Sequence, residues 1–212
     1  MSEVLPLVLF TTCAGLAVGG YLMAAIFGDP SVKDGKPQPV FPIVCLALLG
    51  AGLLATLVHL GQPMRFVNGL SNPSSMIAQE GYWSMAAGIL MLIDVILVVV
   101  KKAAVRPLRA AIAAAGIGVM IVTGLAYYNA TGLPVWHGTA TMFLMVAGDV
   151  ALGCALYLLF ADGEATAPLR TSIAVAAAWA LTLVAFALQA GGAGADVTAA
   201  VVVSGLVGAA AP

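Results

Sequence analysis

The chain has 212 residues, of which 62% are hydrophobic and 8% are charged, and its formal net charge is −1. A soluble domain carries about 25% charged residues, because polar groups must cover its surface. This composition therefore excludes a soluble fold. The near-neutral charge also excludes a nucleic-acid role, since no basic surface exists to neutralise phosphates. We expect an all-α integral membrane protein that forms a single transmembrane domain over residues 1–212.

The apolar segments are long enough to cross a membrane. A transmembrane helix needs roughly 20 apolar residues to span about 30 Å of hydrocarbon. Six segments meet this length, whereas the last has about 16 residues, or roughly 24 Å of helix. The sequence predicts a bundle of seven or eight transmembrane helices, of which seven are assigned: 5–27, 41–60, 82–100, 109–127, 138–160, 170–190 and 196–211.

Lysine and arginine are distributed unevenly between the two sets of loops. One set holds a single cation, Arg65, whereas the other holds seven: Lys33, Lys36, Lys101, Lys102, Arg106, Arg109 and Arg170. Cytoplasmic loops of membrane proteins carry the excess of Lys and Arg. The pattern predicts that the N-terminus and the loops 61–81 and 128–137 face outward from the inner (cytoplasmic) membrane.

The connection between the second and third predicted spans concentrates rare polar groups. His59 ends the second span, Glu80 begins the third, and Arg65 lies between them. One interpretation is a polar rim at the membrane interface. The alternative is a site for a hydroquinone that enters from the lipid, because its oxidation releases two protons. A neutral imidazole and a carboxylate at the membrane edge can accept those protons and pass them to water.

Three sequence stretches suggest a family. Residues His59–Arg65 read H-L-G-Q-P-M-R, and Glu80 follows at the predicted start of the next span. This pattern resembles the H-L-G-x-P-x-R signature, followed by a glutamate, of the membrane-anchor subunits of dimethyl sulfoxide reductase. Supporting similarity lies in Phe10–Gly20 (F-T-T-C-A-G-L-A-V-G-G) and in Tyr128–Trp136 (Y-N-A-T-G-L-P-V-W).

The resemblance implies a non-catalytic anchor that binds and oxidises menaquinol. Its electrons would pass to an iron–sulfur subunit and then to a molybdopterin catalytic subunit, both docked on the outer face. His59 and Glu80 would serve the quinol, with Arg65 as a further candidate that orders the loop or contacts the partner. The resemblance also implies that this protein holds no haem and no iron–sulfur cluster. Relatives have an additional crossing at the C-terminal end, where this sequence is shorter.

Two acids are predicted deep in the bilayer, Asp94 and Asp149. A charge at the bilayer centre costs about 2.5–3.5 kcal/mol even on the mildest scale, so both should face protein or water. One interpretation is that they are hydrogen-bonded and hold helices together. The other is a proton path, which would suit a small proton-coupled transporter. That transporter is the main alternative to an anchor, and a polysulfide reductase-type quinone anchor is a second.

The sequence contains one further histidine, His137, at the predicted start of the fifth span. With His59 it allows a bis-histidine haem, although haem ligands are usually buried further within a span. The three cysteines, Cys13, Cys45 and Cys154, lie inside apolar runs and have no metal-binding spacing. We therefore expect no metal site.

Overall fold

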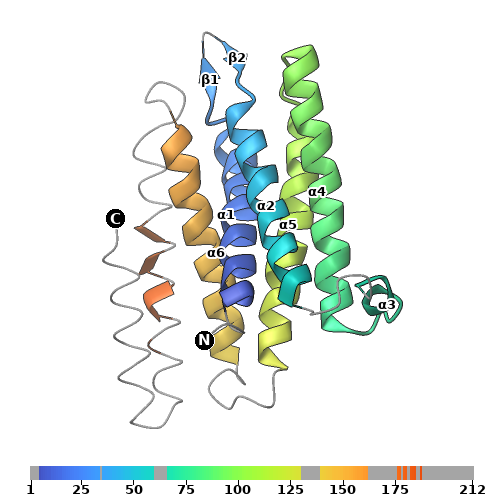
Figure 1. Cartoon of the computed structure of the whole chain (residues 1–212). Coiled ribbons are helices and arrows are strands. Elements are labelled where there is room, and N and C mark those ends of the chain that lie inside the picture. Colours follow the sequence, from blue (N-terminus) through green and yellow to red (C-terminus); the bar gives the residue numbers. More distant parts are fainter. Residues whose placement is uncertain are drawn as a thin grey trace.

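The structure is a computed structural model that describes residues 5–33, 35–59, 66–129 and 139–161, together with short helical pieces between 176 and 187. Its main elements are five long helices that run alternately up and down (Figure 1). They are α1 (Leu5–Phe27), α2 (Val40–His59), α4 (Met76–Lys101), α5 (Arg106–Tyr128) and α6 (Thr139–Phe160). All five are long and apolar enough to cross a membrane.

The helix ends agree with the predicted spans except at one position. Helices α1, α2, α5 and α6 begin and end within three residues of the predicted boundaries. Helix α4 begins at Met76, six residues before the predicted start at residue 82. Polar residues such as Gln79 and Glu80 interrupt the apolar pattern, but they are good helix formers and extend the helix. The predicted spans 170–190 and 196–211 lie outside the described residues, apart from the short pieces, and stay predictions.

Small elements mark the two ends of the bundle. Strands β1 (Val32–Lys33) and β2 (Lys36–Pro37) form an antiparallel hairpin, with Lys33 opposite Lys36. This agrees with the expectation of an exposed, non-helical connection between the first two spans. The short helix α3 (Phe66–Leu70) lies at the other end, before α4 begins (Figure 1). We call these the hairpin end and the α3 end.

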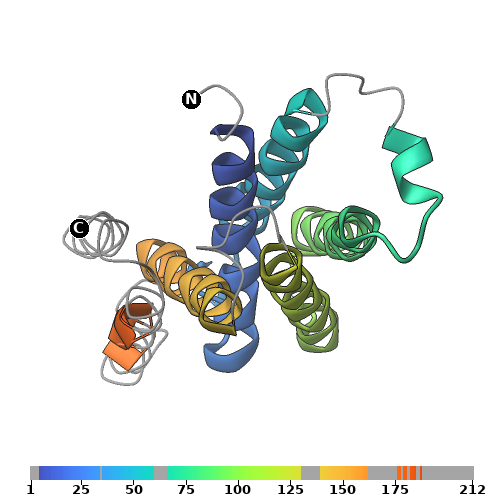
Figure 2. The ribbon, with the colours of Figure 1, turned by 90° about the horizontal axis from the view of Figure 1, so that it is seen from below.

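Helix α1 lies at the centre of the bundle, as the view along the helices shows (Figure 2). It packs against α2, α5 and α6, and its residues Ala17, Val18 and Tyr21 are fully buried. Its closest approach is to α6, through Gly19 and Gly153. A Cβ atom on Gly19 would lie 2.8 Å from the Cα atom of Gly153. Small residues allow such close packing where no hydrophobic force draws helices together in lipid.

Adding a methyl group at this contact should destabilise the bundle. We expect Gly19→Ala to lower the free energy of unfolding by about 1–3 kcal/mol, because the new atom must displace the backbone of α6. Gly50→Ala is the matched control, since a Cβ atom there meets nothing within 4 Å. Thermal unfolding of the detergent-purified protein measures both. Equal stability of the two variants would contradict the proposed packing.

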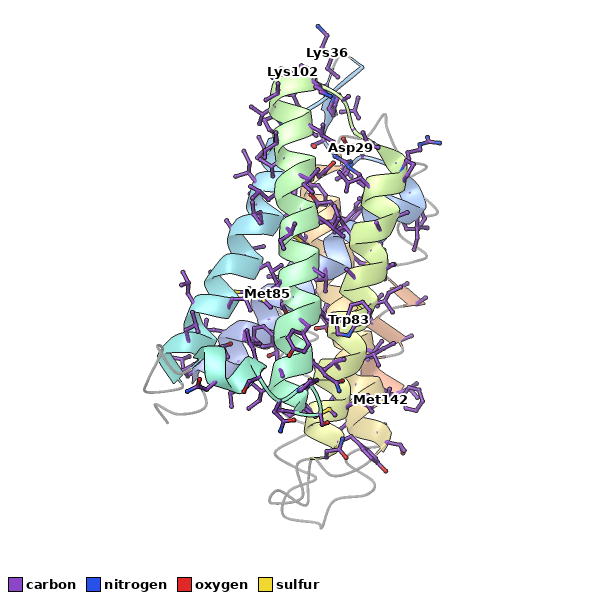
Figure 3. The ribbon with its side chains drawn as sticks, turned by 90° about the vertical axis from the view of Figure 1, so that its right-hand side faces the viewer. Asp29, Lys36, Trp83, Met85, Lys102 and Met142 are labelled. Atoms are coloured by element: carbon purple, nitrogen blue, oxygen red, sulfur yellow. The ribbon has the colours of Figure 1, made fainter. Side chains whose placement is uncertain are left out.

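The basic side chains gather at the hairpin end. Among the described residues, they are Lys33, Lys36, Lys101, Lys102, Arg106 and Arg109. Figure 3 shows Lys36 and Lys102 close to Asp29 at this end, with Met142 at the opposite end. The described cations of the expected cytoplasmic side therefore lie together. Arg65 and Arg170 lie outside the described residues, and the outward direction of the N-terminus stays a prediction.

Arg109 was counted as a loop cation, and this interpretation is wrong. Its side chain is buried in α5, with 4% exposure, and forms ion pairs with two acids. Its Nη1 atom is 2.9 Å from Asp29 Oδ2, and its Nε atom is 3.2 Å from Asp94 Oδ2. The Tyr21 hydroxyl donates a hydrogen bond to the same Asp94 oxygen at 3.0 Å. Asp94 thus joins α1, α4 and α5, which confirms the hydrogen-bonded interpretation for this acid.

Candidate functional site

The site builds on the turn that leads from α3 into α4. The Asn72 side chain accepts a hydrogen bond from the Ser74 amide at 3.2 Å, which is the pattern of an Asx turn. The Gln79 amide group donates to the Pro73 carbonyl at 3.2 Å, and the Tyr82 hydroxyl donates to the Leu70 carbonyl. These polar side chains therefore hold α3 and the turn against the first two turns of α4.

Glu80 lies in the second turn of α4, not at its start as predicted, because the helix begins at Met76. Its side chain is half-buried and forms one wall of a groove of about 140 Å³ between α1, α2 and α4. The other walls are almost entirely apolar: Phe10, Leu53, Thr56, Leu57, Ile77, Gly81 and Met85. Ile77 and Met85 are 50% and 37% exposed, so the rim of the groove reaches the outer surface of the bundle.

The structure brings the end of α2 to the same groove. Thr56 and Leu57 line it, and His59 is the last residue of that helix. Position 59 follows Thr56 by three residues, and residues so spaced lie on the same side of a helix. The His59 side chain and the whole of Arg65 lie outside the described residues. The structure therefore supports the juxtaposition of these two helix ends, while contact of His59 or Arg65 with Glu80 stays a prediction.

Two polar residues of α5 approach Glu80 from the other side. Thr123 is 4% exposed, and its hydroxyl lies near the Glu80 carboxyl without the geometry of a full hydrogen bond. Tyr127, one turn further along α5, interacts electrostatically with the carboxyls of both Glu80 and Asp149. Glu80 thus lies between an apolar groove and a small polar cluster inside the bundle.

No described cation lies beside Glu80. The ion pairs among the described residues involve Arg109, which interacts with Asp94. Asp94 is 14 residues beyond Glu80 on α4, or about 21 Å at 1.5 Å per residue. The acid–arginine network and the Glu80 groove are therefore separate features. Asp149 is 8% exposed, and its carboxyl occupies the space in which a Gly15 side chain would lie.

The described residues offer no cluster of metal ligands. Among them, no three histidine, cysteine or acidic side chains lie close enough to hold a metal ion. His137, one of the two histidines of the haem alternative, lies outside the described residues. The thiol of Cys154 contacts the sulfur of Met23 at 3.3 Å, in the packed core between α6 and α1. This contact is consistent with the interpretation of Cys154 as a small buried apolar residue.

Sequence reasoning did not identify several groove residues. Phe10 comes from the first span and Thr123 from the fifth helix, and apolar or hydroxyl residues at such positions look like ordinary core. Thr56 offered a detectable signal, because it precedes His59 by one helical turn. Conversely, Gln79, Tyr82 and Asn72 were considered as groups that hydrogen-bond a ligand. The structure shows them bound to the backbone of the turn and of α3.

Comparison with known proteins shows where this protein belongs. The family model of the DMSO reductase anchor subunit (DmsC) matches residues 1–204. The chain belongs to this anchor-subunit family. A subunit of the anaerobic dimethyl sulfoxide reductase of Haemophilus influenzae is 32% identical over 165 residues, which is 73% of the present chain. The aligned part covers 58% of that relative. No solved structure matches the sequence.

Family membership confirms the resemblance carried by His59–Arg65 and Glu80. Together with the five long apolar helices, it establishes a multi-pass membrane protein of the DmsC family. The match also favours the dimethyl sulfoxide reductase type over the polysulfide reductase type of anchor. The transporter alternative loses one of its two candidate residues, because Asp94 is fully buried in an ion pair with Arg109.

Proposed function

We propose that this DmsC-family protein is the menaquinol-oxidising membrane anchor of a dimethyl sulfoxide reductase-like complex. It would pass electrons to an iron–sulfur subunit, which supplies a molybdopterin catalytic subunit in anaerobic respiration. The observation that carries this proposal is the groove between α1, α2 and α4. It combines apolar walls with the Glu80 carboxyl, and the helix that ends at His59 forms one side.

The size of the groove suits a ring with a lipid-soluble tail. Pockets that enclose a whole drug-sized ligand have about 300–1,000 Å³, whereas this one has about 140 Å³. A flat quinol ring can therefore enter while its isoprenoid tail stays in the hydrocarbon. The exposed rim residues Ile77 and Met85 provide an apolar entrance from that side.

The polar groups have separable roles in this proposal. When bound, a menaquinol supplies two electrons and two protons as it is oxidised to the quinone. Glu80 accepts a proton from one ring hydroxyl, and a neutral His59 imidazole accepts the other. Arg65 orders the connecting loop or contacts the partner subunit. Each proton then leaves to the aqueous phase at the α3 end, which the loop charges predict to be the outer side.

The same end offers the docking surface for the partner subunits. The fastened turn from Leu70 to Tyr82 presents uncharged polar side chains over a rigid backbone. Cores of protein–protein interfaces are depleted in charged residues and enriched in aromatic ones. An iron–sulfur subunit docked here would lie next to the Glu80 groove, so that electrons leave over a short path. The opposite end carries the described lysines and is the less suitable surface.

Isolation of the tagged protein from native membranes tests this function. We expect it to copurify with iron- and molybdenum-containing subunits, and the complex to reduce dimethyl sulfoxide with a menaquinol analogue. Metal analysis and the oxidation rate of the analogue are the two measurements. A protein that purifies alone and without these metals, from cells that grow by anaerobic respiration, would rule out the anchor role. A complex that accepts electrons only from soluble donors would rule out quinol oxidation.

A further inference from the structure

A second cavity lies at the hairpin end, away from the Glu80 groove. It has a volume of about 580 Å³ and lies between the end of α1, strand β1 and the first turn of α5. Its walls include Phe27, Asp29, Arg106 and Arg109. We propose that this cavity binds the phosphate group of a membrane lipid. The proposal is independent of the quinol function, because the two sites share no residue.

The first observation is the incomplete hydrogen bonding of Arg109. Its Nη1 and Nη2 atoms are buried, and neither has a hydrogen-bond partner among the described residues, although Nη1 is 2.9 Å from Asp29 Oδ2. Burying an unsatisfied donor costs about 1–3 kcal/mol, and more for a charged group. A guanidinium has five N–H donors in a planar fork that matches the oxygens of a phosphate. An acceptor-rich ligand in this cavity would satisfy these donors.

The second observation is the start of helix α5, at the same cavity. Val105 is the N-cap residue, and it offers no side-chain hydrogen bond to the first turn. The amides of Arg106 and Leu108 therefore have no acceptor within the helix, while Pro107 has no N–H group. The helix dipole places partial positive charge at this end. Arg106 is exposed and lines the cavity, so it adds a full charge beside these amides.

The charge balance favours a phosphodiester over free phosphate. Arg109 and Arg106 together offset the carboxyls of Asp29 and Asp94, so the immediate charges sum to zero. A lipid phosphodiester adds one negative charge, whereas inorganic phosphate adds about 1.5–2 at neutral pH. Lysines at the same end, such as Lys36 and Lys102, compensate a single charge more readily (Figure 3). Basic pockets between transmembrane helices bind lipid head groups in this way.

The apolar half of the cavity points to the same source. Its α1 wall consists of Ala24, Ala25, Ile26 and Phe27, and Ile26 is 61% exposed on the bundle surface. Free phosphate has no use for such a wall. A glycerolipid needs it, because the glycerol and the first carbons of the acyl chains must pass from the head group into hydrocarbon. The lipid lies with its phosphate between Arg106 and Arg109 and its acyl tails along the end of α1.

Lipid binding to the full-length protein in detergent tests the phosphate contact. Native mass spectrometry with phosphatidylglycerol should show a retained lipid, whereas diacylglycerol with the same acyl chains should not bind. Arg106→Gln should weaken binding about tenfold or more, since it removes a charge-assisted contact. Lys36→Gln is the matched control, because it removes one charge at the same end without lining the cavity. Equal losses in the two variants would show nonspecific attraction and overturn the proposal.

A second pair of variants tests the location without altering charge. Ala25→Trp places a large ring in the cavity and should displace the lipid. Ala86→Trp adds the same ring at an exposed position on α4, outside the cavity, and should leave lipid binding unchanged. Retention of the lipid by folded Ala25→Trp would overturn the proposed site. Displacement of the lipid by millimolar inorganic phosphate would assign the site to free phosphate and overturn the lipid assignment.

Discussion

Glu80→Gln is expected to abolish menaquinol-dependent turnover while the complex still assembles. The substitution keeps the size of the side chain and its place in the groove, but an amide accepts no proton from the ring hydroxyl. A general base contributes about 10²–10⁴-fold to a rate, so we expect at least about a 100-fold loss. The rate of oxidation of a menaquinol analogue by the purified complex measures this. Reduction by a soluble donor, which bypasses the anchor, should be unchanged.

The controls separate this role from a general loss of structure. Lys101→Gln removes a charge at the other end of the same helix and should leave the rate unaltered. His59→Leu should behave like Glu80→Gln, because the second proton then lacks its acceptor. Arg65→Gln should lower activity less than either, if Arg65 only orders the loop. Normal turnover of quinol by an assembled Glu80→Gln complex would show that the groove is not the oxidation site.

The transmembrane helices were predictable because each is a continuous apolar run. Boundaries were accurate where Pro, Gly or charged residues end the run, as at Phe27 before the Gly28–Pro39 connection. The start of α4 was missed because its first turns carry Gln79 and Glu80, which the lipid-crossing criterion rejects. Backbone hydrogen bonding, which the polar residues tolerate well, sets the true start. Helix existence therefore followed from hydropathy, whereas this helix end did not.

The candidate site was predictable in part. A histidine, an arginine and a glutamate in one outer connection formed a visible exception in a sequence with so few charges. The groove that Glu80 lines was not visible, because Phe10 and Leu53 are indistinguishable from other apolar residues until α1 and α2 pack against α4. Sequence patterns mark the rare polar groups of a membrane protein, whereas the shape around them depends on helix packing.

Arg109 shows the opposite error. Its position next to a basic turn gave it the pattern of a loop cation, and hydropathy offers no way to distinguish a buried arginine from an exposed one. Its partners, Asp29 and Asp94, come from two other parts of the sequence. Only the packing of α4 and α5 against the end of α1 brings them together. The cavity at the hairpin end was missed for the same reason.

Loss of Arg109 is expected to be the most destabilising single change in this network. Arg109→Leu leaves the buried carboxyls of Asp29 and Asp94 without their cation, and breaking a buried pair in this way costs about 3–5 kcal/mol. We expect little folded protein in membranes and a marked fall in the unfolding temperature of what remains. Arg106→Leu is the matched control, because that exposed side chain lies three residues earlier and forms no ion pair among the described residues.

The double variant identifies the cause of that loss. In Arg109→Leu with Asp94→Asn, the second substitution removes one of the two uncompensated charges, so part of the stability should return. We expect an interaction free energy of about 1–3 kcal/mol between the two positions, as is typical of residues in one ion-pair network. Thermal unfolding of both single variants and the double variant gives this value. If the two losses simply add, Arg109 acts by packing alone, and the ion pairs with Asp94 and Asp29 contribute nothing to holding α1, α4 and α5 together.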